Sequence, residues 1–458
     1  MKTLILTIIA LACAGCAVVG AESLPPPAGE PSGAYYDWTR TKQPERPFFH
    51  KYDQNLVMKI FLAEKTNGGQ DCKVFLTFEQ ALEVICKLDN LTCGVPKIVY
   101  LVGWQYNGHD SKYPAWGEVN ARLKRPQDKT ALDSLKWLIA EGRKHHTTVS
   151  LHINMFDAFE SSPLWTEYLA KDIIAKGKDG KPLKGEVFDG GEQSYQLSYA
   201  KEWETGCAKR RIDGLLAMLP ELKEGHTLHI DAFHNYPPVP HAYPKGKYPD
   251  RDWDFKGISP FLGYGPEKEC AAMRKTFRYF RDQGIDITSE GSTFLRQDAF
   301  VGLQPMAWSY NAPAGGIPPS LYCGTPMKAE PEIKRDPAKL NGLLEQFCLN
   351  AAPFVWANAW RAADDRNQPQ AADWNRIRQG NDCCVPLVWK PGKALIAYSR
   401  NGYAAKTWDL PADWITVKTA TLSKVGIESP VPAGTTEIKD GKLTLSLKPG
   451  EAILIEAK

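Results

Sequence analysis

The sequence predicts an α/β protein: a (β/α)8 barrel of the TIM type followed by a C-terminal antiparallel β-sandwich. From about residue 51, short apolar runs rich in β-branched residues alternate with amphipathic helical segments, which is typical of parallel strands joined by crossover helices. After about residue 380, short strands follow one another and are separated by turns rich in Pro and Gly. We therefore expect a catalytic barrel over 51–379 and a sandwich over 380–458.

The predicted elements of the barrel alternate regularly along the chain. The strands are expected over 57–63, 97–104, 147–154, 227–233 and 285–290. The helices are expected over 77–88, 129–145, 200–219 and 266–284. Thr77 and Gln80 offer a capping box for the first helix. No glycine-rich phosphate fingerprint follows a strand, and polar residues cluster just past the strand ends, so a barrel is favoured over a dinucleotide-binding open sheet.

The N-terminus predicts export. Lys2 precedes an apolar run and then small residues, which is the pattern of a signal peptide over 1–21, and the run is too short to span a membrane. Cleavage can follow Ala21, or Cys16 can be acylated as in a lipoprotein, and both routes stay open. The protein is expected to be periplasmic, an outer-surface lipoprotein or secreted. Residues 22–50, rich in Pro, Gly and charge, are expected to be a linker.

Composition narrows the range of partners. The net charge of +3 is close to neutral, so no nucleic-acid partner is expected. No run of about 20 apolar residues follows the signal region, so no transmembrane span is expected. Eleven cysteines include two in the signal region, and the odd number left implies at least one thiol without an intrachain partner. Their spacing does not match a zinc site, so neither a metal nor another cofactor is expected.

Polar residues end four of the expected strands or follow them directly. They are the segments 104–110 (WQYNGHD), 152–154 (HIN), 229–231 (HID) and 289–291 (SEG). Glycoside hydrolysis needs two carboxyl groups flanking the scissile bond, one protonated and one ionised. Asp231 and Glu290 form the best candidate pair, because each ends an apolar strand that fixes its direction and partly desolvates it.

The segment VYLVGWQYNGHDSKYPAW, residues 99–116, strongly resembles the catalytic-barrel motif of glycoside hydrolase family 101, the endo-α-N-acetylgalactosaminidases. The preceding segment FEQALEVICKLDNLTCGVPKIVYLV is similar to that family as well. Shorter likenesses follow in LHIN, QSYQLSYAKEW, LHIDAF and ITSEG, so that the resemblance covers about residues 75–310. It implies a retaining mechanism on α-linked N-acetylgalactosamine (GalNAc), with Asp231 as nucleophile and Glu290 as general acid/base.

The resemblance also implies substrate contacts. Asp110 and Asn154 are expected to hydrogen-bond the hydroxyl groups of the sugar at the cleavage point, with His109 as a neighbour. Trp104, Tyr106 and Trp308 either stack on sugar rings or pack the rim of the barrel, and the sequence leaves both interpretations open. The long segment 234–265, rich in Pro, Tyr and His, is expected to build part of the substrate site.

Three functions follow as hypotheses. The first is removal of GalNAc or Galβ1-3GalNAc from Ser or Thr of mucin-type O-glycoproteins. The second is an α-galactosidase or other α-glycosidase of the same mechanism, because the chain is shorter than typical family members and lacks a tryptophan-rich segment over 155–193. The third is a surface glycan-binding protein without catalysis. Oligomeric state and disulfide pattern stay open.

Overall fold

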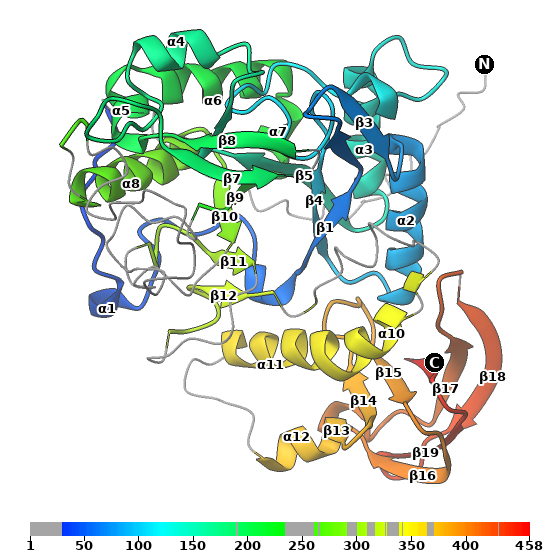
Figure 1. Ribbon diagram of the computed structural model, residues 1–458. Coiled ribbons are helices and arrows are strands. Elements are labelled where there is room, and N and C mark those ends of the chain that lie inside the picture. The colour runs from blue at the N-terminus through cyan, green and yellow to red at the C-terminus, as the bar shows by residue number, and fades with distance from the viewer. Residues whose placement is uncertain are drawn as a thin grey trace, which may run out of the picture.

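The structure is a computed structural model, drawn in Figure 1. It describes the ranges 30–188, 191–233, 261–263, 266–290, 300–308, 317–325, 327, 339–340, 342–363, 371–428 and 430–458. The predicted signal peptide and most of the long segment 234–265 therefore lie outside the described residues. None of the helices in the described part of the chain has the length and apolarity that crossing a bilayer requires.

The centre of the protein is a sheet of seven strands in the order β1-β4-β5-β9-β10-β11-β12, and every neighbouring pair is parallel. The strands are β1 (Leu56–Phe61), β4 (Lys97–Val102), β5 (Thr147–Asn154), β9 (Thr227–Asp231), β10 (Asp286–Glu290), β11 (Met306–Trp308) and β12 (Cys323–Gly324). The parallel α/β arrangement predicted from the sequence is confirmed as a half-barrel. An eighth strand joining β12 to β1 is not among the described residues.

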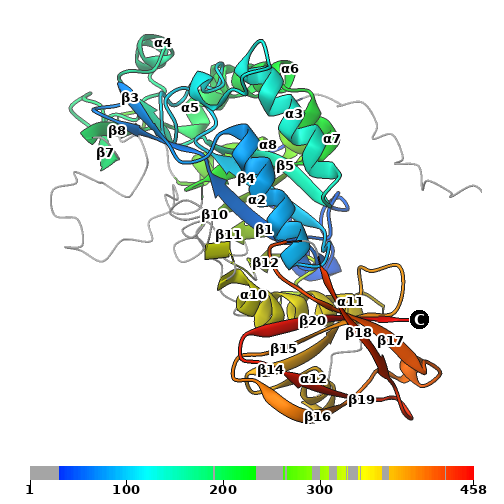
Figure 2. The same ribbon diagram turned by 90° about the vertical axis from the view of Figure 1, so that its right-hand side faces the viewer.

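Helices cover the outer face of this sheet, as Figures 1 and 2 show. They are α2 (Phe78–Leu91), α3 (Ala131–Arg143), α5 (Tyr199–Glu204), α6 (Cys207–Met218), α7 (Glu221–Gly225) and α8 (Pro266–Asp282). The predicted capping box is present, since the Thr77 side chain accepts from the Gln80 amide and the Gln80 side chain accepts from the Thr77 amide. The single helix predicted over 200–219 is instead two helices, because Gly206 between them is left-handed.

Two small sheets are inserted between the strands of the half-barrel. A hairpin of β2 (Ala63–Thr66) and β3 (Asp71–Val74) follows β1. A three-stranded antiparallel sheet contains β6 (Asp157–Phe159), β8 (Glu192–Gln196) and β7 (Lys184–Phe188), with α4 (Trp165–Ala170) beside it. These insertions and the C-terminal strands lie at opposite ends of the molecule in Figures 1 and 2.

The C-terminal region is antiparallel. A six-stranded sheet runs in the order β13-β14-β15-β20-β17-β18 and packs against the pair β16-β19 through a core that includes Trp408, Leu443 and Ile455. The strands are β13 (Arg378–Gln379), β14 (Asp382–Pro386), β15 (Ala394–Ser399), β16 (Tyr403–Asp409), β17 (Thr419–Lys424), β18 (Val431–Glu437), β19 (Lys442–Leu447) and β20 (Glu451–Ala457). The predicted antiparallel C-terminal fold is confirmed, while the domain boundary at residue 380 stays a prediction.

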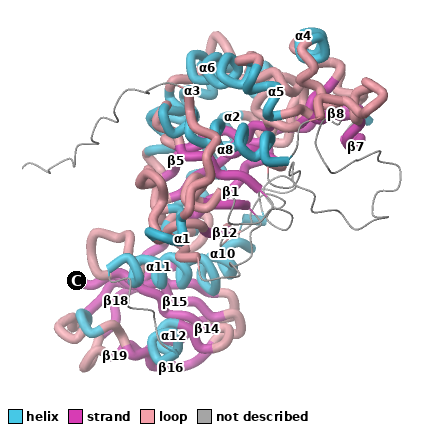
Figure 3. The backbone as a smooth tube through the Cα atoms, turned by 90° about the vertical axis from the view of Figure 1, so that its left-hand side faces the viewer, coloured by secondary structure: helices cyan, strands magenta, loops and turns pink. Residues whose placement is uncertain are grey.

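Helices α10 (Gly342–Gln346) and α11 (Ala352–Ala363) lie between the two sheet regions, as Figure 3 shows. The C-terminal region also contacts the loop that precedes β4. Trp389 Nε1 donates to the Cys93 carbonyl at 3.1 Å, and Asn90 Nδ2 donates to the Ile427 carbonyl at 3.1 Å. The antiparallel region therefore sits at the amino-terminal end of the parallel strands.

Residues 30–50 were expected to be a linker, but in the structure they lie along α8 and are called the N-terminal strap here. Arg278 donates to the carbonyl groups of Ser32 and Ala34 at 2.7 Å and pairs with Glu45. Arg274 donates to the Gly33 carbonyl at 2.7 Å. Because α8 presents a row of guanidinium groups at helical spacing, it binds this irregular segment mainly through its backbone carbonyls.

Candidate active site

The carboxyl ends of neighbouring parallel strands bring four of the predicted site residues into one row. Asn154 pairs with Asp231 in the register of β5 and β9. Ser289 pairs with Ile230, which places Glu290 beside Asp231, and Glu290 pairs in turn with Trp308 on β11. Residues two apart on a strand share a face, so His229 lies on the same face as Asp231. Leu228 and Ile230 face the other way, into the core beneath the helices.

Asp231 and Glu290 are electrostatically coupled. Burial raises the pKa of Asp231 well above its usual range, and the neighbouring charges of Glu290 and Asp110 add to that rise. Burial also acts to raise the pKa of Glu290, but the ammonium of Lys59, together with His229 and Asp231, holds this pKa well below its usual range. The two residues lie beside each other at the ends of β9 and β10.

Lys59 is the residue of this site that the sequence analysis missed. Its side chain is buried and its Nζ donates to Glu290 Oε1. The same Nζ lies 5.1 Å from the centre of the Trp308 ring. Lys59 belongs to β1, whose remaining residues Leu56–Phe61 are apolar. A single lysine inside an apolar strand indicates a functional or structural ion pair, because a buried ammonium requires a partner. The sequence analysis could have used this signal.

Three histidine rings follow one another across the floor of the site. The ring of His152 lies 5.6 Å from that of His109 and 5.4 Å from that of His229. His152 Nε2 is 3.3 Å from Asp231 Oδ2, and His229 Nε2 is 3.6 Å from Glu290 Oε1. Burial and the charge of Lys59 lower the pKa of His152 well below its usual range and that of His229 to about 4. Both rings are therefore neutral at pH 7.

The loop after β4 brings His109 and Asp110 to this floor. Gly103 and Gly108 have positive φ, and a Cβ at either position would lie within 3 Å of the Ala63 backbone. Glycine at both positions lets the loop lie against the end of β1, where the His109 amide donates to the Ala63 carbonyl at 2.8 Å. The Asp110 side chain is buried, and its Oδ1 has no hydrogen-bond partner among the described residues, although His109 Nε2 is 3.4 Å away.

The Asn154 side chain makes hydrogen bonds to neighbouring residues of the protein. Its Oδ1 accepts from the amides of Phe156 and Asp157 at 2.7 and 2.8 Å, and its Nδ2 donates to Asp157 Oδ2 at 2.7 Å. The residue is 0% exposed. Both lone pairs of the amide oxygen are occupied, so the side chain caps the turn after β5 and is not positioned to accept a hydrogen bond from a sugar hydroxyl.

The three aromatic candidates separate clearly. Trp104 is 0% exposed and its Nε1 donates to the His152 carbonyl at 2.9 Å, which favours packing over stacking, the two interpretations that the sequence left open. Tyr106 is partly buried, and its amide donates to the Glu118 carbonyl at 3.2 Å. Trp308 is the only one of the three placed beside the carboxyl pair, through its register with Glu290 and its contact with Lys59.

Metal binding is geometrically possible where the sequence spacing did not predict it. Within the described residues, two groups place their ligand atoms within 4.8 Å of one another: His109, His152 and Asp231, and His152, His229 and Glu290. Neutral imidazoles with a carboxylate are a ligand set that Zn²⁺ accepts. The ammonium of Lys59 beside Glu290 opposes a cation in the second group, because like charges repel strongly at this depth.

Comparison with known proteins identifies the kind of domain that carries this site. Residues 68–240 match the family model of Endo-alpha-N-acetylgalactosaminidase, glycoside hydrolase family 101. The match spans less than half of the chain, includes Asp110, Asn154 and Asp231, and ends before Glu290. The chain thus contains a divergent domain of the family 101 type, and this match places the protein among the glycoside hydrolases. No curated protein sequence matches the chain.

Several solved structures are similar in outline. Alpha-N-acetylgalactosaminidase NagBb from Bifidobacterium bifidum shares 14% identity over 58% of this chain and 41% of its own, with a TM-score of 0.40. The alpha-amylase of Anoxybacillus shares 10% identity over 89% of this chain and 99% of its own, with a TM-score of 0.43. The family 36 alpha-galactosidase AgaA from Geobacillus stearothermophilus shares 11% identity over 90% of this chain and 57% of its own, with a TM-score of 0.41. The chain spans about two fifths of the length of NagBb, and at these scores the likenesses assign no residue role.

Proposed function

We propose that the protein is a retaining glycoside hydrolase that releases α-linked GalNAc or Galβ1-3GalNAc from Ser or Thr of mucin-type O-glycoproteins. The observation that carries the proposal is the pair of Asp231 and Glu290, which end adjacent parallel strands side by side. Retaining enzymes hold their two carboxyl groups at about 5–5.5 Å, whereas inverting enzymes separate them to about 6.5–9.5 Å so that a water fits between them. Neighbouring strands lie about 4.8 Å apart, so two carboxyl groups side by side on adjacent strands suit the shorter separation and favour retention.

The reaction needs one proton on the pair of carboxyl groups. Catalysis requires Asp231 ionised, to attack the anomeric carbon, and Glu290 protonated, to donate to the leaving oxygen. The raised pKa of Asp231 and the lowered pKa of Glu290 are the reverse of this assignment, so substrate binding must favour the state with the proton on Glu290. After the glycosyl–Asp231 ester forms, Glu290 takes a proton from water, and the resulting hydroxide equivalent releases the sugar and restores Asp231.

Substrate recognition rests on polar atoms that the protein leaves without partners. Asp110 Oδ1 and both ring nitrogens of His152 are buried and make no hydrogen bond within the described structure. Such groups carry a desolvation cost that a ligand hydroxyl removes when it binds. A carboxylate accepts hydrogen bonds from two sugar hydroxyls, which suits the axial 4-hydroxyl of galacto sugars.

The finer predictions of fold and location belong to the same proposal. We propose that the seven parallel strands are part of a closed eight-stranded barrel whose carboxyl-terminal rim carries the site. A signal peptide over 1–21, with either Cys16 acylated or cleavage after Ala21, would export the enzyme to where mucin-type substrates are found. The chemistry described for Asp231 and Glu290 uses no cofactor.

The test is product analysis by mass spectrometry on two glycopeptides, one bearing GalNAc-α-Ser/Thr and one bearing Galβ1-3GalNAc-α-Ser/Thr. Release of the disaccharide shows endo action, and release of GalNAc alone shows exo action on a single sugar. Turnover confined to aryl α-galactosides would move the assignment to the second hypothesis. Binding of glycopeptide without any turnover would move it to a glycan-binding protein.

Variants assign the roles. Asp231→Asn and Glu290→Gln should each lower kcat by about 10²–10⁴-fold or more, because each removes a group that reacts in the transition state. Asp179→Asn is the matched control, because this carboxylate is well exposed on a distant turn. Early products followed by NMR should keep the α configuration. Full activity in either active-site variant, or a β product, would refute the mechanism.

A further inference from the structure

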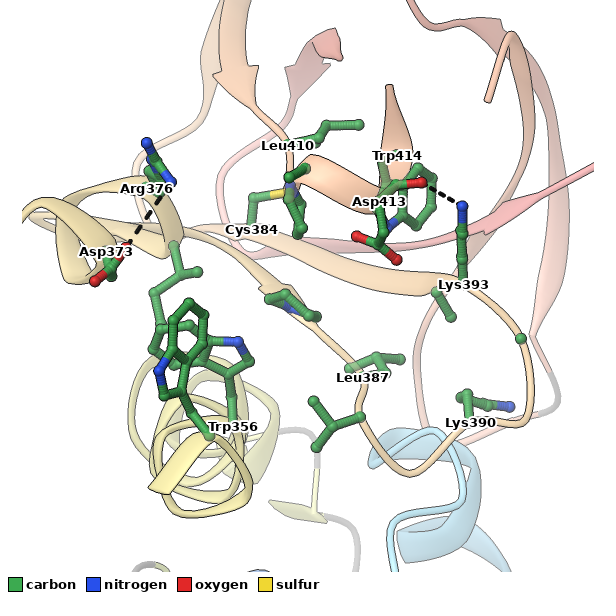
Figure 4. Close-up of a pocket in the computed structure, with 18 of the residues that line it drawn as sticks. Trp356, Asp373, Arg376, Cys384, Leu387, Lys390, Lys393, Leu410, Asp413 and Trp414 are labelled. Carbon is green, nitrogen blue, oxygen red and sulfur yellow. Dashed lines mark hydrogen bonds and ion pairs between the residues drawn. The ribbon is translucent and has the colours of Figure 1, made fainter. Parts of the chain in front are cut away.

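A second cavity, distinct from the carboxyl pair, opens between α11, α12 (Ala371–Ile377) and the antiparallel C-terminal region (Figure 4). Its volume is about 620 Å³, within the about 300–1,000 Å³ that small-molecule sites occupy. The strand and loop that line it, around Leu387 and Lys390, adjoin Trp389, which contacts Cys93 in the loop before β4. The cavity therefore lies toward the amino-terminal end of the parallel strands, away from Asp231 and Glu290 at their carboxyl ends.

Three tryptophan side chains line the cavity, and Trp360 is the exposed one, since Trp356 and Trp414 are 5% and 2% exposed. Trp356 and Trp360 are four residues apart on α11, so they share one face of the helix, with ring centres 5.2 Å apart. Trp360 lines the cavity and is 40% exposed, so its ring is accessible to a ligand. Trp414 closes the wall from the turn at 411–414, and Figure 4 shows it across the cavity from Trp356.

Charged side chains lie at the edges of the cavity, and their positive and negative charges balance. The described lining includes three aspartates and three basic residues: Asp373, Asp409, Asp413, Arg376, Lys390 and Lys393. Arg376 is 3.8 Å from Asp373, and Lys393 donates to the Asp413 carbonyl, as the dashed lines in Figure 4 mark. A phosphorylated or otherwise charged ligand would need an excess of one sign, which this lining does not offer.

A purely apolar ligand also fits poorly. It would cover the edge groups without offering hydrogen bonds, and desolvated charges without partners oppose binding. The lining instead suits a neutral molecule that has a flat apolar face for the indole rings and hydroxyl groups around its rim. A pyranose ring has this combination, since its axial C–H bonds form an apolar face and its hydroxyls point outward.

We propose that this cavity is a second carbohydrate site, which binds a neutral mono- or disaccharide against Trp356 and Trp360. It goes beyond the proposed catalytic function, since none of its residues belongs to the row that ends in Asp231 and Glu290. A sugar site at the opposite end of the half-barrel would hold a glycan chain without competing for the catalytic centre.

The experiment is hydrogen–deuterium exchange on the full chain without its signal peptide, with and without Galβ1-3GalNAc or GalNAc. Saturable protection of peptides covering 352–363 and 386–394 is expected, because these segments line the cavity. Trp360→Ala should weaken that binding by at least about tenfold, since it removes the more accessible indole. Trp360→Phe should recover part of it, and Tyr35→Ala, a similarly exposed aromatic on the N-terminal strap, should leave it unchanged.

Glucose 6-phosphate and the apolar dye ANS serve as competing probes. Protection of the cavity peptides by either of these, and by no neutral sugar, would overturn the proposal. So would protection by neutral sugars that persists in Trp360→Ala. The readout is local protection and not turnover, so loss of the catalytic assignment and loss of this site would be seen separately.

Discussion

Replacing Lys59 by methionine tests how the carboxyl pair is controlled. Lys59 donates to Glu290 and supplies the main effect that lowers the pKa of that carboxyl group. Two opposite charges about 4 Å apart interact by about 4 kcal/mol at an effective dielectric constant of about 20, which corresponds to about three pKa units. An ammonium favours the ionised form of both carboxyl groups, so removing it raises both pKa values of the pair.

The assay is the pH dependence of kcat/KM on an aryl α-GalNAc substrate. The active state has one proton on the pair, so the acidic limb reports the second protonation and the alkaline limb reports loss of the shared proton. In Lys59→Met both limbs should move to higher pH, by about one to three units. Lys59→Arg keeps the charge and is the matched control, whose limbs should stay near those of the wild type.

The reasoning is refuted if both limbs of Lys59→Met stay at wild-type positions while thermal unfolding shows an intact fold. A shift in the opposite direction would refute it equally, because it would mean that Lys59 acts on the pair other than through its charge. If the variant has no measurable turnover, titration of the side-chain carboxyl carbons by ¹³C NMR gives the same two pKa values directly.

Two further predictions concern stability. Burial raises the pKa of Glu269 to about 7. Between about pH 4.5 and 7 the folded state therefore binds more protons than the unfolded state. The free energy of unfolding should fall by about 3 kcal/mol as the pH rises through this range. In denaturant melts at several pH values, Glu269→Gln should lose most of this fall in stability, whereas Glu267→Gln, at an exposed position, should keep it. The prediction is contradicted if stability depends on pH equally in the wild type and in Glu269→Gln. Asn154→Ala should cost about 3 kcal/mol, because it removes three hydrogen bonds and leaves two buried amides without partners. Asn67→Ala, at an exposed turn, is the control, and an unchanged Tm with a raised KM would restore Asn154 as a sugar ligand.

The strands and helices of the half-barrel were predictable because their signals are local. Thr77 and Gln80 mark the start of α2, and the expected strand over 147–154 matches β5 (Thr147–Asn154) residue for residue. The insertions were not predicted. The strands β6, β7 and β8 are three to five residues long and pair antiparallel across intervening chain, so each carries too few residues to show a period.

The site was predictable where a polar residue ends an apolar strand, as Asp231 and Glu290 do. It was not predictable where the decisive fact is a contact between distant segments. Lys59 and Glu290 are 231 residues apart in sequence, and only the barrel-like curvature joins them. The same limit applies to Trp104, because an aromatic residue after a strand faces either the rim or the core, and the sequence does not say which.

The N-terminal strap also bears on where the enzyme can work. If Cys16 carries a lipid, the chain free to span from the membrane to the folded part is residues 16–30 and not 16–50, because Ser32, Ala34 and Glu45 are held by Arg278. Fourteen extended residues reach at most about 50 Å, compared with about 120 Å for the longer span. The attachment point of the folded part of a lipidated enzyme would thus stay within about 50 Å of the membrane surface.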